Sequence, residues 1–171
     1  MTDGCGRIDR PQAADFADWY TFPVVLLVTL VLKGPLTEEV AWRGFALPRL
    51  LDRLSPVVAS LLLGGIWALW HLPLLVSDST GQRPPLPFAA GLGALSIIFS
   101  WVYLRTRGSL LLATLLHAMV NTMAAFVFPA FQGDSYERLW WIYAGVLWAT
   151  ALAVLALGRD LRARAPGAAP Q

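Results

Sequence analysis

The sequence holds few of the side chains from which disulfides, metal sites and nucleic-acid interfaces are built. Cys5 is the only cysteine among 171 residues, so neither an internal disulfide nor a cysteine-based metal site can form. The chain has only two histidines, and charged residues make up 14% of it, against about 25% in an ordinary soluble domain. The net charge of +2 is too small to suggest nucleic-acid binding.

What the chain has in abundance is apolar sequence, with 57% hydrophobic residues and a mean hydropathy of +0.58. A helix needs about 20 apolar residues to cross a bilayer. Five segments approach that length, namely residues 21–47, 56–72, 88–104, 110–128 and 139–157. Between them lie "RLLDRLSP", "PLLVSDSTGQRPPLP", "RTRGS" and "PAFQGDSYER", which we predict to be loops. We therefore predict an all-α, polytopic transmembrane bundle of about five spans in the lipid bilayer.

The chain divides into three predicted parts. Residues 1–18 form a polar N-terminal segment without the apolar stretch of a signal peptide. Residues 19–158 form a membrane-embedded domain, and residues 159–171 form a basic, polar tail. Inside the first span, Lys33-Gly34-Pro35 is a helix-breaking sequence, so that span is either continuous or a short span followed by a re-entrant or amphipathic helix.

The arginines predict an orientation in the membrane. If the five spans alternate, seven arginines fall on one side: Arg49, Arg53, Arg105, Arg107, Arg159, Arg162 and Arg164. The loops on the other side hold only Arg83 and Arg138. Because positively charged loops stay in the cytoplasm, we predict a multi-pass protein of the cell (inner) membrane with a cytoplasmic C-terminus.

Apart from Lys33 at the helix-breaking sequence, the charged, histidine and amide side chains inside the predicted spans are Glu38, Glu39, Arg43, His71, His117 and Asn121. Ionisable residues within a membrane are costly, and they usually face the interior of the bundle or a water-filled cavity. Both histidines of the protein belong to this set.

The spacing of the acidic residues predicts two different roles. Glu39 and Arg43 are four residues apart, so they share a helix face and are predicted to form a buried structural pair. Glu38 lies about 100° further round the helix. We therefore predict that Glu38 has no charged partner, faces a cavity and serves as a general base.

The remaining polar residues have helical spacing as well. His117 and Asn121 are four residues apart and can donate hydrogen bonds to one point, as in an oxyanion hole. His71 follows Trp67 by four residues, and the aromatic ring is predicted to fix the imidazole. A single histidine or asparagine in a membrane helix is equally consistent with a bond to a neighbouring helix. The whole set, on three helices, favours a site.

Three motifs in this order, "EEVAWRG", "WALWH" and "HAMVN", resemble those of the CPBP intramembrane endopeptidases. That family includes the type II CAAX prenyl proteases, lysostaphin-resistance-like proteins and bacteriocin-processing or immunity proteins. The resemblance covers roughly residues 33–125, and Trp67 stands where the family usually has phenylalanine. It implies an all-helical membrane protease acting on a protein or peptide substrate, with CAAX-type lipidated proteins or bacteriocins as the substrate classes.

The resemblance also implies roles for the polar set. Glu38 would activate a water molecule and His71 would position it, either directly or through a metal. His117 and Asn121 would stabilise the oxyanion, with Glu39 and Arg43 as a supporting pair.

Two chemical models and two other functions stay open at this stage. Glu38, His71 and His117 could ligate Zn²⁺, although Glu38 would then be both ligand and base. The other model is a metal-free water site. The other functions are a catalytically silent scaffold or immunity protein of the same fold and a proton-coupled transporter, against which no second half resembles the first.

Overall fold

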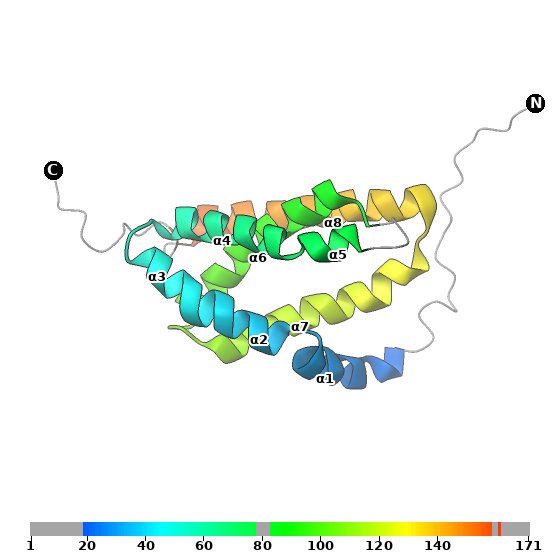
Figure 1. The fold of residues 1–171 in the computed structure, drawn as a ribbon, viewed down its shortest axis with the longest axis horizontal. Helices are drawn as coiled ribbons and strands as arrows, with labels where there is room; N and C mark the ends of the chain where they lie inside the picture. The colour runs from blue at the N-terminus through cyan, green and yellow to red at the C-terminus, as the bar shows by residue number, and fades with distance from the viewer. Residues whose placement is uncertain (1–18, 78–82, 159–160, 162–171) are drawn as a thin grey trace, which may run out of the picture.

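The computed structural model of the chain describes residues 19–77, 83–158 and 161, and all regular structure in these ranges is helical (Figure 1). This confirms the predicted all-α class. The elements in chain order are η2 (Trp19–Thr21), α1 (Phe22–Leu32), α2 (Pro35–Glu39), η3 (Val40–Ala46), α3 (Leu47–Leu51), α4 (Pro56–Trp70), α5 (Leu72–Val76), α6 (Pro85–Arg105), α7 (Leu110–Val127), η4 (Phe128–Ala130) and α8 (Gly133–Leu157). The predicted segments 1–18 and, except for Leu161, 159–171 lie outside the described residues.

The described helices account for the predicted spans. Four stretches are long and apolar enough to cross a membrane: Pro56–Val76, Pro85–Arg105, Leu110–Ala130 and Gly133–Leu157. A fifth consists of two pieces, Trp19–Leu32 and Pro35–Leu51, which meet at an angle of 49°. The prediction of about five spans is therefore confirmed, with the first span bent.

The bend in the first span follows from its sequence. Gly34 has a φ of 101°, a left-handed conformation that residues with a Cβ rarely adopt. Pro35 follows as the first residue of α2, where its missing N–H costs no helical hydrogen bond. The amide of Lys33 still bonds to the carbonyl of Thr29 at 3.1 Å, so α1 ends at this point.

Three of the predicted loops are partly helical, and there the prediction is wrong. α3 and α5 each overlap the start of a segment predicted as a loop. α8 begins at Gly133 rather than at residue 139. The polar start of α8 is capped locally, because the hydroxyl of Ser135 accepts from the amide of Gln132 at 3.3 Å and donates to its carbonyl at 2.6 Å. Apolar runs mark only the lipid-spanning part of a helix and miss a polar, capped first turn.

α6 forms the centre of one group of helices, in contact with α4 on one side and α8 on the other (Figure 1). α4 and α6 cross closely because both present small residues. A Cβ added to Gly64 would lie 3.0 Å from both Gly93 Cα and Ser96 Cβ, and the Ser96 hydroxyl donates to the carbonyl of Ser60 at 2.8 Å. Close approach through small residues is the usual way in which membrane helices associate.

A second group consists of α1, α2 and α7, which contact one another (Figure 1). The two groups are joined by contacts of α6 with α7 and of α3 with α4. α2, which carries the acidic pair, and η3 therefore pack beside α7. The junction of α4 and α5 approaches from the other group. This arrangement brings three segments that are distant in the sequence around one cavity.

Candidate active site

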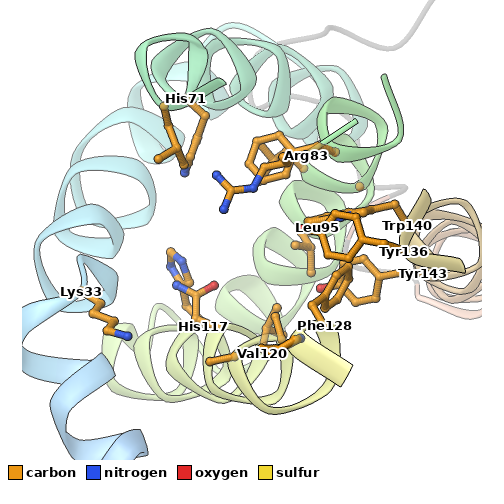
Figure 2. A pocket seen from close by; sticks show the side chains of 18 of the residues that line it. Lys33, His71, Arg83, Leu95, His117, Val120, Phe128, Tyr136, Trp140 and Tyr143 are labelled. Carbon is orange, nitrogen blue, oxygen red and sulfur yellow. The ribbon is translucent and has the colours of Figure 1, made fainter. Parts of the chain in front are cut away.

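The four predicted catalytic residues line one cavity of about 740 Å³. Glu38 comes from α2, His71 from the junction of α4 and α5, and His117 and Asn121 from α7. Figure 2 shows His71 and His117 pointing into the cavity from opposite walls. Trp67 of α4 also lines it. The structure thus brings together the residues that sequence spacing placed on three separate helices.

Glu39 and Arg43 lie behind the cavity wall and are fully buried. Arg43 Nη1 donates to Glu39 Oε1 at 2.9 Å, so the two form an ion pair. The guanidinium carbon lies 5.0 Å from the ring centroids of both Trp67 and Phe99, a cation–π arrangement in two directions. A buried arginine held by a carboxylate and two aromatic faces has little freedom to move.

The helix that carries this pair is not α-helical throughout. Glu39 ends α2, and η3, which contains Arg43, is a π-helix. Spacing arguments based on 3.6 residues per turn therefore hold only approximately here, although the Glu39–Arg43 contact still forms. π-helical turns inside helices occur frequently at functional sites.

Glu39 also contacts the histidine of α7. His117 Nδ1 lies 2.8 Å from Glu39 Oε1, the same oxygen that accepts from Arg43. Because a carboxylate oxygen accepts, Nδ1 is the donor, and Nε2 is the nitrogen left for the cavity. A donor role for Nε2 requires a proton on both ring nitrogens.

Glu38 accepts hydrogen bonds from two indoles, which the sequence did not predict, and the ion pairs found among the described residues do not include it. Glu38 Oε2 accepts from Trp67 Nε1 at 2.8 Å and, at 3.5 Å, from Trp42 Nε1. Its other oxygen lies over Gly34, where an added Cβ would come within 2.5 Å of Oε1. Glycine at that position therefore makes room for the carboxylate as well as for the bend.

His71 is fixed by the turn that precedes it. Its Nδ1 donates to the carbonyl of Trp67 at 2.9 Å, so Nε2 is again the nitrogen available to the cavity. The ring makes edge contacts with Trp67 at 5.9 Å and with Phe88 at 5.5 Å between centroids. The predicted packing of Trp67 on this imidazole is present, and it is accompanied by the backbone hydrogen bond.

Trp67 makes more contacts in the site than we predicted from the sequence. It is 2% exposed and contacts Glu38 through its N–H, His71 and His117 through its ring edges, and Arg43 through its face. A phenylalanine would make the ring contacts but not the hydrogen bond. The presence of tryptophan instead of the usual phenylalanine was the available signal, because only the indole carries a donor.

The geometry does not support the zinc site that the sequence left open as one of two models. Within the part of the chain that the structure describes, no group of three or more histidine, cysteine, aspartate or glutamate side chains could hold a metal ion. Glu38, His71 and His117 face one cavity without forming a ligand cluster, and both Nδ1 atoms are occupied by protein acceptors. The residues present do not fit a zinc centre.

The fold and the polar cavity define a multi-pass membrane protein with a candidate hydrolytic centre. Comparison with protein families matches residues 20–123 to the family described as "Type II CAAX prenyl endopeptidase Rce1-like", and the chain belongs to this family. The matched range contains all seven candidate and supporting residues.

A curated relative agrees with the family. The chain is 33% identical over 124 residues to "CAAX prenyl protease 2" of Methanococcus maripaludis, an alignment that covers 68% of this chain and 45% of the relative. The chain therefore spans less than half the length of that protein.

Proposed function

We propose that the chain is an intramembrane endopeptidase that hydrolyses a peptide bond near the end of a membrane-associated or lipidated protein or peptide. The observation that carries this proposal is the convergence of Glu38, His71, His117 and Asn121 on one cavity. Membership in a family described as CAAX prenyl endopeptidases supports the reaction class. CAAX-type proteins and bacteriocin precursors are the substrate classes to test.

In the proposed reaction, Glu38 is the general base. A water molecule between its carboxylate and His71 Nε2 gives a proton to the carboxylate as its oxygen attacks the scissile carbonyl carbon. The carbonyl π bond breaks, and its electron pair becomes the oxyanion of a tetrahedral intermediate. When the intermediate collapses, the C–N bond breaks and the proton held by Glu38 passes to the departing amine, so no external acid or oxidant is needed.

His117 and Asn121 are the proposed oxyanion donors. They lie one helical turn apart on α7 and line the cavity together. In this role His117 carries a proton on each nitrogen, donating from Nδ1 to Glu39 and from Nε2 to the oxyanion. Donors fixed before the reaction stabilise the developing charge without reorganisation in the transition state.

The buried residues behind the cavity wall orient the reacting groups and take no part in the reaction itself. Arg43 and Glu39 orient His117, and Trp67 with Trp42 orients the carboxylate of Glu38. No step is routed through a metal, because the cavity residues do not form a ligand group.

The test compares the wild-type protein with Glu38→Gln in neutral detergent, using a library of quenched-fluorescent peptides with and without a prenyl group. The amide keeps the shape of the side chain and removes the base. Cleavage by the wild type alone supports the proposal, and equal cleavage by both proteins would overturn it. An added strong chelator leaves the wild-type rate unchanged if the reaction needs no metal.

We also propose that the protein lies in the cell (inner) membrane with its C-terminus in the cytoplasm. The exposed arginines Arg53 and Arg138 lie on opposite sides in this orientation. In a Cys5→Ser background, Arg138→Cys should react in intact cells with a membrane-impermeant maleimide, whereas Arg53→Cys should react only after lysis. The reverse pattern would invert the orientation.

A further inference from the structure

The bend between α1 and α2 lies next to the proposed general base. Gly34 is the residue before α2, and its carbonyl accepts from the amide of Glu38 at 2.8 Å and from the hydroxyl of Thr37 at 3.0 Å. Lys33, its neighbour in the sequence, lines the cavity (Figure 2). The first turn of α2 therefore holds the backbone of Glu38 at a fixed place relative to Gly34.

The two oxygens of the Glu38 carboxylate have different surroundings. Oε2 accepts hydrogen bonds from the indole N–H groups of Trp67 at 2.8 Å and Trp42 at 3.5 Å. The hydrogen bonds and ion pairs found among the described residues do not include Oε1, which lies over Gly34 instead. A carboxylate oxygen offers about two lone-pair sites, so Oε1 keeps its sites for a proton, whereas those of Oε2 are occupied by indoles.

The position of Oε1 depends on the absence of a side chain at residue 34. A Cβ added to Gly34 would lie 2.5 Å from Oε1 and 3.4 Å from the carboxyl carbon of Glu38. The carboxylate is the far end of a flexible side chain, so it can turn away from such a Cβ more easily than the helices can shift. That turn would draw Oε2 away from the indole of Trp67. A side chain at residue 34 would therefore displace the carboxylate.

Building on the proposed endopeptidase function, we propose that Gly34 is a positioning residue of the site and that Oε1 of Glu38 is the oxygen that takes the proton from water. In this step an O–H bond of the water breaks, its proton binds Oε1, and an electron pair of the water oxygen forms the bond to the carbonyl carbon. The indoles fix Oε2, and the space over Gly34 fixes Oε1. Glycine at residue 34 thus serves both the bend and the base.

The first test is Gly34→Ala, with kcat and KM measured on the best peptide of the library. We expect kcat to fall by about a hundredfold, the effect of misplacing a reacting group by about 1 Å, with KM nearly unchanged. An unchanged kcat would overturn the proposal. The unfolding midpoint in detergent reports whether the variant is folded.

Gly108→Ala is the matched control for backbone strain. Gly34 and Gly108 both have a left-handed φ, 101° and 86°, so alanine strains the backbone at either position. An added Cβ at Gly108 would have the side chain of Tyr103 as its nearest neighbour, at 3.4 Å, and Gly108 does not line the cavity. This variant should keep the wild-type kcat. An equal loss of kcat in both variants would assign the effect to strain and overturn the proposal.

Glu38→Asp separates the contact with the carboxylate from the strain. The shorter side chain withdraws the carboxylate from residue 34, so the alanine no longer meets Oε1. Adding Gly34→Ala should then lower kcat by no more than about twofold, against about a hundredfold in the wild type, because the two substitutions are coupled. Equal losses in the two backgrounds would show that the contact with Glu38 is not the origin of the effect.

An infrared measurement follows the carboxylate without turnover. The difference spectrum between the wild type and Glu38→Gln in neutral detergent isolates the carboxyl bands of Glu38, whose frequencies depend on its hydrogen bonds. The same difference should show shifted bands in the Gly34→Ala background and unshifted bands in the Gly108→Ala background. Unshifted bands in Gly34→Ala would overturn the proposal, even where Glu38→Asp is too slow to assay. A failure of the proposed function appears separately, as equal peptide cleavage by the wild type and Glu38→Gln.

Discussion

Glu38 and Glu39 are adjacent in the sequence, yet they belong to two different regions of the molecule. Glu38 lies on the cavity wall, half-buried, and accepts hydrogen bonds from the neutral indole N–H groups of Trp67 and Trp42. Glu39 lies in the buried network behind that wall, where the Arg43 guanidinium and the His117 imidazole both contact one of its oxygens. One residue step along a helix is enough to separate a carboxylate on the cavity wall from one in the buried network.

The difference shows how a membrane protein can hold acidic groups at low cost. A buried carboxylate needs a cation and a further hydrogen bond, and Glu39 has both on Oε1. A carboxylate that must take up a proton during a reaction needs donors that fix it without neutralising its charge, which indoles supply to Glu38. Substitutions on each side should therefore affect different properties, rate on the cavity wall and stability in the buried network.

The largest effect is expected from Glu38→Gln. It should lower kcat by about 10²–10⁴-fold, the usual contribution of a general base, while the thermal unfolding midpoint in detergent stays close to that of the wild type. Glu39→Gln is the matched control with the same chemical change, and it should shift the unfolding midpoint. Equal effects of the two substitutions on both properties would contradict the division into two regions.

Arg43→Met should have the next largest effect, a loss of stability. It leaves the Glu39 carboxylate buried with only His117 as a partner, and removing one member of a buried pair typically costs about 3–5 kcal/mol. Denaturant unfolding in detergent measures this loss. The double substitution Arg43→Met with Glu39→Gln should recover part of the stability, and no recovery would mean that the ion pair is not the origin of the effect.

Asn121→Ala should act on rate alone. Asn121 lines the cavity and is only half-buried, so its loss leaves no buried charge behind. Removal of one oxyanion donor typically lowers kcat by about 10²–10³-fold. The measurement is kcat and KM with the best peptide of the library. A change confined to KM would assign Asn121 to substrate binding instead.

Trp67→Phe should give the smallest effect on the rate, and it tests the hydrogen bond to Glu38 separately from the ring contacts. It keeps an aromatic ring beside His71, His117 and Arg43 but removes the donor to Glu38, a hydrogen bond to a charged group worth about 1.5–3 kcal/mol. We expect kcat to fall by roughly tenfold with KM nearly unchanged. Trp70→Phe is the control, because Trp70 lies one turn of α4 away and does not line the cavity.

Much of the fold was predictable because lipid imposes long apolar runs. The second to fifth spans follow directly from such runs, and the helix-breaking sequence at Lys33-Gly34-Pro35 marks the bend in the first. The polar start of α8 and the short helices α3 and α5 were not predictable in this way. Their residues are too polar or too few to give a hydropathy signal. At the start of α8, the local cap of Gln132 and Ser135 marks where the helix begins.

The sequence predicted which residues form the candidate site, but not the contacts between them. Polar residues inside spans single out Glu38, His71, His117 and Asn121, and spacing of four residues pairs Glu39 with Arg43. Contacts between helices depend on tertiary packing, which one sequence does not reveal. The bonds from His117 to Glu39 and from Trp67 to Glu38 join residues 78 and 29 positions apart, so no local rule anticipates them.

The position of the cavity has a consequence for the compartment from which substrates arrive. Several of the residues that line it, Arg83 and Gln132 among them, lie where α5 leads to α6 and α7 leads to α8, at the end of the bundle away from α3 (Figure 1). The arginine-rich connections lie at the α3 end. If maleimide labelling places that end in the cytoplasm, the cavity receives its substrates from the far side of the membrane, and they must be exported before they are cut. If labelling places it outside, cytoplasmic proteins are the candidates, and the distribution of arginine does not set the orientation of this chain.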